Sequence, residues 1–148
     1  YNTPCNLFVA GFIGSPQMNF LDAVVNVKGN DVTLQIGNTT LHVPAAKAKA
    51  LIDGGYNGKT VVMGIRPEHV YDDEEHIKAN PNSVMEGKIT VYELLGAEVY
   101  LYFDLEGFDC TARVNARTTA RPGDKVKFAI DVEKIHVFDK ETEQIITN

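Results

Sequence analysis

The fold of this chain is decided by the stretch Val32-Thr33-Leu34-Gln35-Ile36-Gly37-Asn38-Thr39-Thr40-Leu41-His42-Val43. Apolar residues alternate with polar ones on both sides of Gly37-Asn38, and a period of two is typical of a strand with one buried face. A glycine next to an asparagine between two such runs indicates a tight turn. We therefore predict two short strands here, in a meander whose earlier turn is Gly29-Asn30-Asp31.

Strand patterns continue in both directions from this stretch, with one interruption. After Pro44, the segment Ala45–Ile52 is rich in good helix formers, and Asp53-Gly54-Gly55 ends it, so one interior helix is predicted. One helix among many short strands favours a mainly β chain, built as a small barrel or sandwich. The other predicted strands are residues 18–27, 59–65, 88–91, 99–105, 110–114, 126–132 and 135–138.

The chain opens on an uncharged, strongly apolar segment, Phe8–Phe20. Asn6 is a suitable helix N-cap and Gly14 a suitable stop, so a short N-terminal helix is predicted between them, apolar on nearly all sides and therefore buried or paired. Because the sequence starts at Tyr1 without a methionine, we expect an excised piece. Residues 1–17 would be the helix and a linker from a missing domain, and residues 18–148 the β domain.

The acidic, polar stretch at residues 72–83 predicts an exposed loop or a joint between subdomains. The whole chain has 148 residues and a net charge of −6, which disfavours general binding of nucleic acid. No apolar run approaches the ~20 residues of a membrane-spanning helix. Cys5 and Cys110 are far apart, which favours two free thiols in a reducing compartment.

The segment Asp53-Gly54-Gly55-Tyr56-Asn57-Gly58-Lys59-Thr60 ends like a phosphate-binding P-loop. A P-loop has a glycine where this chain has Asp53, and it leaves a strand to enter a helix, whereas here a helix is predicted before the turn and a strand after it. We therefore interpret this segment as a glycine turn. Neither serine lies in a nucleophile elbow, and no histidine pair has metal-ligand spacing, so no catalytic residue, cofactor site or metal site is predicted.

Four phrases in order along the chain resemble the C-terminal regulatory region, OB-like and TOBE-type, of sugar-importer ABC transporter ATPases of the maltose transporter ATPase family. They are Phe12-Ile13-Gly14-Ser15-Pro16-Gln17-Met18-Asn19-Phe20, Gly64-Ile65-Arg66-Pro67-Glu68-His69, Arg121-Pro122-Gly123-Asp124-Lys125-Val126-Lys127-Phe128 and Ile135-His136-Val137-Phe138-Asp139. The resemblance implies OB-like β-barrel subdomains. It also implies that ATP and Mg²⁺ bind a missing N-terminal ATPase domain rather than this chain.

The same resemblance implies a regulatory and dimerisation domain that tethers two ATPase subunits and offers a surface to regulators. The implied partners are a second copy of the chain, the missing ATPase domain, membrane permease subunits and a protein regulator, with no nucleic acid. The implied location is cytoplasmic, at the inner face of the membrane. From motif position and apolar character we expect interface or regulatory residues at Phe8, Val9, Phe12, Ile13, Ser15, Pro16, Met18, Asn19, Arg66, Pro67, Glu68 and His69.

Two alternatives remain open at this level. A small-ligand or oxyanion-binding OB-like module would use Thr118, Thr119 and Lys125, which are the local candidates for such a cleft. A nucleic-acid-binding barrel would use a basic stripe made of Arg113, Arg117, Arg121, Lys125 and Lys127. It would also need stacking aromatics on the same face, of which Phe108 is the nearest, and acidic residues intervene. For Arg66-Pro67-Glu68-His69 a rigid structural turn is favoured over a contact surface.

Overall fold

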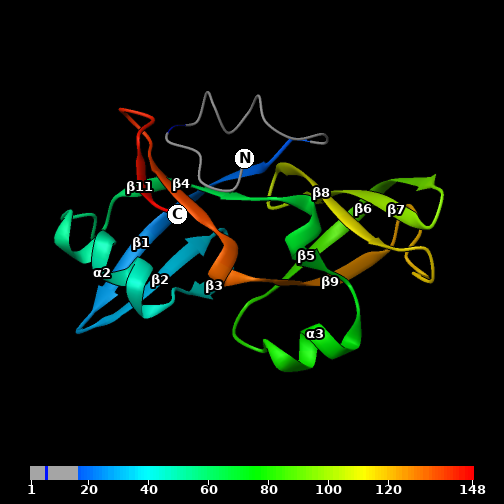
Figure 1. The fold of residues 1–148 in the computed structure, drawn as a ribbon, viewed down its shortest axis with the longest axis horizontal. Helices are drawn as coiled ribbons and strands as arrows, with labels where there is room; N and C mark the ends of the chain where they lie inside the picture. The colour runs from blue at the N-terminus through cyan, green and yellow to red at the C-terminus, as the bar shows by residue number, and fades with distance from the viewer. Residues whose placement is uncertain (1–5, 7–16) are drawn as a thin grey trace.

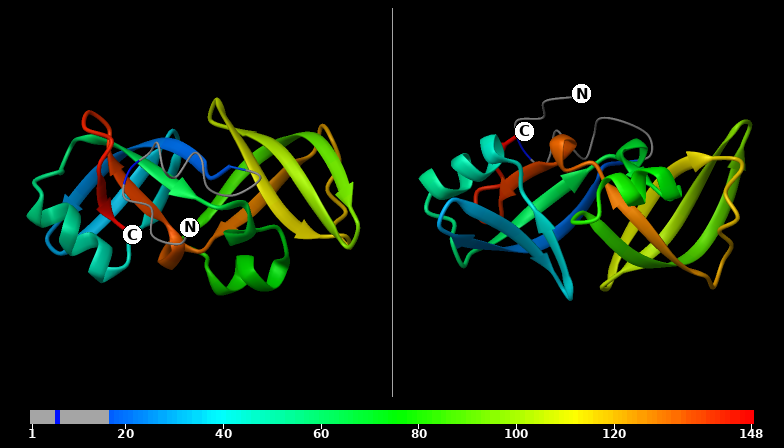
Figure 2. Two further views of the ribbon diagram at one scale, coloured as in Figure 1. Left: turned by 45° about the horizontal axis from the view of Figure 1, so that its top comes forward. Right: turned by 90° about the horizontal axis from the view of Figure 1, so that it is seen from below.

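The computed structural model describes Asn6 and residues 17–148, and it is mainly β (Figure 1). The strands form two antiparallel sheets. The first has the order β11-β10-β4-β1-β2-β3 and the second the order β5-β9-β6-β7-β8. Figures 1 and 2 show them as two curved, barrel-like halves lying side by side. The first sheet comprises β1 Asn19–Lys28, β2 Asp31–Ile36, β3 Thr39–His42, β4 Thr60–Ile65, β10 His136–Asp139 and β11 Ile145–Thr147.

The five strands of the second sheet are β5 Val70–Tyr71, β6 Val84–Leu95, β7 Glu98–Leu105, β8 Phe108–Asn115 and β9 Lys125–Ile130. In β7 and β8 the apolar residues recur with a period of two and point into the half-barrel. In β7, for example, Val99, Leu101, Phe103 and Leu105 are buried while the residues between them are not. The mainly β, OB-like fold class predicted from the sequence is thus confirmed.

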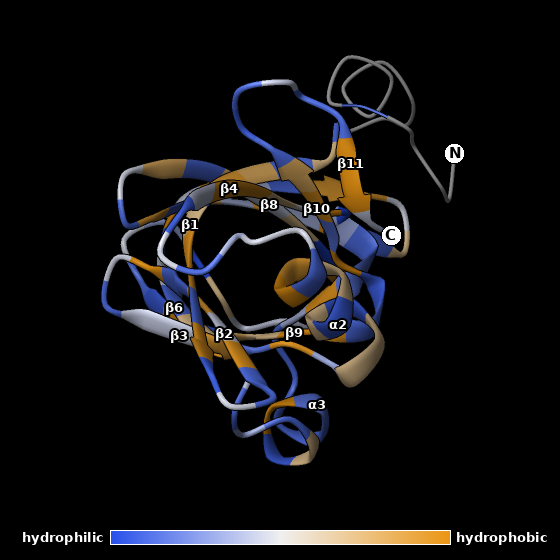
Figure 3. Cartoon of the chain, turned by 90° about the vertical axis from the view of Figure 1, so that its left-hand side faces the viewer, coloured by the Kyte–Doolittle hydropathy of each residue, from blue (hydrophilic) through white to orange (hydrophobic). Residues whose placement is uncertain are grey.

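The stretch that decides the fold forms β2 and β3 as predicted. Leu34, Ile36 and Leu41 are fully buried, and Leu34 pairs with Leu41 across the hairpin. Gly37 lies in the turn with a φ of +57°, a conformation that residues with a side chain adopt only at a cost. The predicted interior helix is α2, Ala45–Asp53, which inserts Ala48 and Leu51 into the core. Figure 3 shows α2 beside the curved strands, whose apolar and polar segments alternate.

The chain passes between the sheets at two short 3₁₀ helices, η1 Pro67–His69 and η2 Val132–Lys134. The segment Gly64–His69 therefore ends β4 of one sheet and leads into β5 of the other. The stretch at 72–83, for which a loop or joint was expected, links β5 to β6 within the second sheet and contains a second helix, α3, Glu74–Ala79. The prediction of a single interior helix was therefore incomplete, and β11 was also not predicted.

Residues from separate parts of the chain join the two halves. The side-chain amide of Asn19, at the start of β1, donates from Nδ2 to the carbonyl oxygen of Thr111 in β8 at 2.8 Å. Its Oδ1 accepts from the backbone N–H of Thr111 at 2.7 Å. One continuous apolar core contains residues of both sheets, such as Leu21 and Leu101. The two halves are therefore packed as one body.

The predicted N-terminal helix between Asn6 and Gly14 lies outside the described residues. Asn6 itself forms an isolated antiparallel bridge with Gln144.

Candidate functional site

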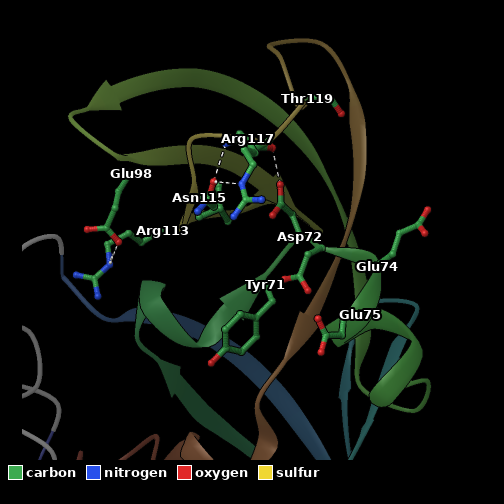
Figure 4. Close-up of a pocket in the computed structure, with 12 residues that line it drawn as sticks. Tyr71, Asp72, Glu74, Glu75, Glu98, Arg113, Asn115, Arg117 and Thr119 are labelled. Carbon is green, nitrogen blue, oxygen red and sulfur yellow. Dashed lines mark hydrogen bonds and ion pairs between the residues drawn. The ribbon is translucent and has the colours of Figure 1, made fainter.

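A cleft of about 710 Å³ lies in the second half of the molecule. One wall is the strand β5 with the start of α3, and the other is the end of β8 with the start of β7 (Figure 4). We call it the acidic cleft, because its carboxylates outnumber its guanidinium groups. It is lined by Tyr71, Asp72, Asp73, Glu74, Glu75, Glu98, Arg113, Val114, Asn115, Arg117, Thr118 and Thr119.

The α3 wall is fixed by a helix cap. Asp73 is the N-cap of α3, and its side chain accepts from the backbone N–H of His76 at 3.1 Å. The same carboxylate oxygen lies 2.6 Å from His76 Nδ1. Tyr71 stacks on the His76 ring with the centroids 3.8 Å apart. Glu74 and Glu75 occupy the first turn, where carboxylates are favoured by the helix dipole.

Burial alone would raise the pKa of Asp73, but the hydrogen bonds from the side chain and backbone of His76 outweigh it, and the pKa lies below its usual value. Asp72 behaves in the opposite way. Its burial raises the pKa of the carboxyl, although the Thr118 hydroxyl donates to Asp72 Oδ2 at 2.5 Å. That hydrogen bond ties the two walls of the cleft together at its base.

The β7–β8 wall carries the two arginines. Arg113 Nε lies 3.2 Å from Glu98 Oε2, and these side chains come from paired strands. Arg117 donates from its backbone N–H and its Nε to Asn115 Oδ1, at 2.8 and 3.3 Å. Figure 4 shows Arg117 and Asn115 next to Asp72, whereas Arg113 and Glu98 lie farther away, with the Arg113 side chain pointing away from Asp72. The α3 wall is therefore acidic, whereas the β7–β8 wall carries two arginines, one of which is already paired with the Glu98 carboxylate.

The Thr118 hydroxyl donates to the Asp72 carboxylate, and the other lining side chains offer charged and polar groups that can bind a ligand. Among the described residues no group of three or more His, Cys, Asp or Glu side chains could hold a metal ion. No helix in the described part of the chain is long and apolar enough to cross a membrane. Burial raises the pKa of the Cys110 thiol to about 12, so this side chain is a poor nucleophile.

The structure places the sequence-predicted interface residues as follows. Phe8, Val9, Phe12, Ile13, Ser15 and Pro16 lie outside the described residues. Met18 and Asn19 are buried, with 3% and 5% of their surface exposed. Met18 packs with Phe138, and a Cβ on Gly64 would meet both of these side chains, so three of the four resemblance phrases meet at this point.

The segment Arg66–His69 serves as the passage between the sheets. Arg66 is 2% exposed and Pro67 is buried, while Glu68 and His69 are half-buried. Pro67 occupies the first position of η1, where its missing N–H and fixed φ are favourable. The burial of Arg66 and Pro67 therefore fits a rigid structural turn. The segment leads directly to Tyr71 at the acidic cleft.

Thr118, Thr119 and Lys125, the candidates for an oxyanion site, do line one smaller cleft of about 370 Å³. Asp72 and Asp124 line the same cleft, and the Thr118 hydroxyl already donates to Asp72. The two carboxylates balance the two lysines of the lining, Lys125 and Lys127, so the cleft carries no excess positive charge for an anion. Two cations of the candidate basic stripe already have partners in the chain: Arg113 pairs with Glu98, and the guanidinium carbon of Arg121 lies 4.3 Å from the centroid of the Tyr92 ring.

The sequence analysis missed the acidic cleft. Its α3 wall was interpreted as a loop, although Asp73 followed by Glu74 and Glu75 is a helix-start signal. The opposite wall had no comparable signal. β5 and the end of β8 are far apart in sequence, so no local pattern shows that they face each other across the cleft. The expected order of helix, glycine turn and strand at residues 53–60 is confirmed: α2 ends at Asp53 and β4 begins at Thr60.

Comparison with protein families gives two matches. The MalK OB fold domain matches residues 14–70, and the TOBE domain matches residues 63–138. The boundary between them coincides with the passage from β4 to β5.

Several curated relatives match almost the whole chain. It is 43% identical to the oligosaccharides import ATP-binding protein MsmX of Bacillus subtilis, over 97% of this chain and 38% of the relative. It is 40% identical to the multiple sugar-binding transport ATP-binding protein MsmK of Streptococcus mutans, over 99% of this chain and 38% of the relative. The trehalose/maltose import ATP-binding protein MalK of Thermococcus litoralis is 35% identical to it, over 99% of this chain and 39% of the relative. The chain thus spans about two fifths of these relatives' length.

Among solved structures, the cytoplasmic molybdate-binding protein ModG with molybdate bound has a TM-score of 0.62, at 16% identity, over 85% of this chain and 97% of that one. At this identity the likeness shows a shared fold.

Proposed function

Because the chain belongs to the TOBE domain family and carries a MalK OB fold domain, we propose that it is the regulatory and dimerisation domain of the ATP-binding subunit of a sugar importer. The observation that carries the proposal is the match, over at least 97% of the chain, to three relatives whose names are those of sugar-import ATP-binding proteins. The chain spans only about two fifths of each, which leaves room for a separate ATPase domain.

In this proposal the domain acts without chemistry of its own. ATP and Mg²⁺ bind the ATPase domain outside this chain. Two copies of the present domain meet and hold two ATPase domains near each other while these open and close. Such a tether raises the effective concentration of one ATPase domain at the other, and it limits how far they separate.

The other proposed partners follow from that role. The ATPase domains contact membrane permease subunits, which holds the assembly at the cytoplasmic face of the membrane. The apolar segment with Phe8, Val9, Phe12 and Ile13, followed by Ser15 and Pro16, docks on the ATPase domain. Of the remaining predicted interface residues, Glu68 and His69 retain exposed surface for a partner, while Met18, Asn19, Arg66 and Pro67 support the interface from within.

We place the regulator-binding surface at the acidic cleft. Its walls are held by specific contacts, namely the Asp73 cap and the pair of Arg113 with Glu98, so a bound segment would meet a preformed surface. A regulator that presents basic side chains to the α3 wall, with Asp72, Asp73, Glu74 and Glu75, would complement it. By binding one arrangement of the two subunits better than the other, such a regulator would shift their equilibrium.

The proposed function is tested with the full-length protein in two measurements. In the absence of nucleotide, sedimentation analysis is expected to give a dimer, and removal of residues 19–148 a monomer. In cells that lack their own importer ATPase, the full-length protein is expected to restore ATP-dependent oligosaccharide uptake. If the full-length protein is a monomer, the proposed dimerisation role is wrong. If oligosaccharide uptake is the same with and without the full-length protein, the proposed importer role is wrong.

The oxyanion-binding alternative is separated by calorimetric titration of the protein with molybdate and tungstate. The carboxylates of Asp72 and Asp124 predict no measurable heat. Binding with micromolar affinity would instead favour the alternative.

A further inference from the structure

The acidic cleft lies where the second sheet stays open. The order of this sheet is β5-β9-β6-β7-β8, so β5 and β8 are its edge strands, and within the described part of the chain they are not paired with each other. Tyr71 of β5 lines one side of the cleft, and residues 113–115 of β8 line the other. An edge strand of the sheet therefore borders the cleft along one side.

The contact of Asn19 marks which backbone groups of β8 point to this edge. The side-chain amide of Asn19 donates to the C=O of Thr111 and accepts from its N–H, at 2.8 and 2.7 Å. Both groups of Thr111 therefore point away from β7. In an antiparallel pair, residues that bond with the neighbouring strand alternate with residues whose groups point away from it. Asp109, Arg113 and Asn115 thus share the orientation of Thr111.

The same contact shows what the free edge of β8 accepts. A side-chain amide presents one donor and one acceptor, which are the two groups that a residue of an added strand also presents. At Thr111, the side chain of Asn19 therefore takes the place of a residue of a further strand. A segment that continues this row beyond Thr111 enters the acidic cleft.

Backbone groups remain available on the part of the edge that lies in the cleft. The C=O of Asn115 accepts from the backbone N–H of Thr118 at 3.0 Å. The N–H and C=O of Arg113 and the N–H of Asn115 have no such partner among the residues that the structure describes. The Arg113 side chain is engaged separately, with Glu98, so at this position the edge offers its backbone. Unpaired backbone groups on an edge strand are a template for another strand.

The wall on the other side of the cleft determines which segment fits. Asp73, Glu74 and Glu75 are exposed there, at the start of α3, and Asp72 lies beside them. A strand that pairs with β8 inside the cleft lies next to these carboxylates, so basic side chains are favoured on it. The volume of about 710 Å³ is in the range of ordinary ligand sites, ~300–1,000 Å³.

We propose that the acidic cleft binds an extended, basic segment of a partner protein, which adds as a strand to the free edge of β8 at Arg113 and Asn115. This inference rests on the regulator-binding surface proposed above and names the form in which the regulator binds. The backbone of the segment bonds with the N–H and C=O of Arg113, and its lysine or arginine side chains pair with Glu74 and Glu75. In strand addition the backbone bonds supply affinity and the side chains supply specificity.

The test is calorimetric titration of the full-length protein with three short peptides in which lysine and threonine alternate, blocked at both ends. The first is unmodified and is expected to bind. The second is N-methylated at every lysine and the third at every threonine, so each loses the backbone donors of one edge while its charge is unchanged. Because only one edge of an added strand faces β8, one methylated peptide should bind at least tenfold more weakly than the unmodified one. The other should stay within about threefold.

Proline variants test the same edge from the side of the protein. Arg113→Pro removes the edge N–H inside the cleft, at a position of the kind where edge strands accept proline. It is expected to weaken binding of the unmodified peptide at least tenfold. Asp109→Pro is the matched control, because it removes the same group from the same edge outside the cleft, and it should stay within about threefold of wild type. Circular dichroism verifies folding of both variants.

The acidic wall is tested by neutralisation. The double variant with Glu74→Gln and Glu75→Gln is expected to bind the unmodified peptide about tenfold more weakly, and its binding should depend less on salt. Hydrogen exchange of the wild-type protein gives a readout that needs no variant. The unmodified peptide should slow exchange at the amides of Arg113 and Asn115, and exchange at Asp109 should stay the same.

The outcomes separate this inference from the proposed function. Weakening by one methylated peptide, together with slower exchange at Arg113, supports strand addition. Equal binding of all three peptides overturns strand addition, because charge alone then attracts basic segments, and it leaves the regulator-binding surface in place. If none of the peptides binds, both the inference and the placement of the regulator at the acidic cleft are wrong. The dimerisation and importer roles are decided separately, by sedimentation and by uptake.

Discussion

His136 is a buried titratable side chain at the junction of the two halves, and only 6% of its surface is exposed. Its Nδ1 lies 3.0 Å from Asn148 Oδ1. Burial lowers the pKa of His136; the Asn148 contact opposes this shift, and the charges of Arg66, Lys47 and His69 add to it. The folded protein therefore resists protonation of this ring more than the unfolded chain does.

The sign of the pH dependence follows from linkage. Above the ordinary histidine pKa of 6.5 both states are neutral, and His136 contributes no pH dependence. As the pH falls below 6.5, the unfolded chain binds the proton first, so the free energy of unfolding decreases. We expect His136→Asn, which keeps a donor toward Asn148, to flatten this slope between pH 7 and pH 5 in urea unfolding. An unchanged slope would contradict this account. The pH dependence of the free energy of unfolding would then come from His69, whose pKa is also lowered.

Gly87 in β6 is a second residue whose environment gives a definite prediction. A Cβ at this position would collide with the ring of Phe103, and it would lie 3.2 Å from the carbonyl oxygen of Asp104. Phe103 is buried and stacked on Phe128 with the ring centroids 4.2 Å apart, so it has little room to move.

We expect Gly87→Ala to lower the free energy of unfolding by about 1–3 kcal/mol, the usual cost of overpacking. The melting temperature should fall by about 2–4 °C per kcal/mol for a chain of this size. Glu86→Ala, the exposed neighbour in the same strand, serves as the control and should stay within about 0.5 kcal/mol of wild type. A stabilised Gly87→Ala would mean that the gain from a less flexible unfolded chain exceeds the clash.

At the scale of the element, α3 depends on its cap. With only six residues, this helix is too short to be stable by propensity. Its Asp73 side chain satisfies the backbone N–H of His76, and replacing such a cap by alanine costs about 0.5–2 kcal/mol. Because none of the α3 residues is buried, this loss should remain local.

We expect Asp73→Ala to accelerate hydrogen exchange of the α3 amides about fivefold to tenfold, while the global free energy of unfolding changes little. Glu74→Ala is the matched control, because its contact with Lys78 is long, at 3.9 Å, and exposed on both sides. A large loss of global stability in Asp73→Ala would show instead that α3 is part of the cooperative core.

The elements also show which parts of the fold could be predicted from sequence. Strands such as β2, β7 and β8 were predictable because their alternation is local, and each keeps its apolar residues on the buried side. The bulge in β6 was not predictable, because Val91 continues the apolar alternation of Gly87 and Ile89, and only the pairing with β7 re-aims it. The sequence therefore gave no sign that Leu94 and Leu95 are exposed at the surface.

At the scale of the whole molecule, local pattern was insufficient. The return of β10 to pair with β4, between elements separated by the entire second sheet, follows from non-local packing that no residue window encodes. The acidic cleft depends on the same long-range arrangement, since Asp72 reaches Thr118 across 46 residues. The resemblance phrases, by contrast, were informative because Met18, Gly64 and Phe138 meet in space.

The arrangement of the two halves gives the last prediction, which concerns Asn19. This buried side chain donates to and accepts from the backbone of Thr111, 92 residues away, and so acts as a polar clamp between β1 and β8. Asn19→Ala removes both hydrogen bonds and leaves the backbone N–H and C=O of Thr111 without these partners. Loss of a partner for a buried polar group costs about 1–3 kcal/mol.

We therefore expect Asn19→Ala to lower the free energy of unfolding by about 2–4 kcal/mol, because two backbone groups lose their partners together. If the clamp holds the halves together, hydrogen exchange should increase at Thr111 and at its β7 neighbour Tyr102 before it increases in β2, which pairs with the end of β1 away from Asn19. Asn26→Ala, an exposed asparagine in the same strand, is the control. Uniform acceleration of exchange over both sheets would instead mean that the halves unfold as one unit and that the clamp only adds to their common stability.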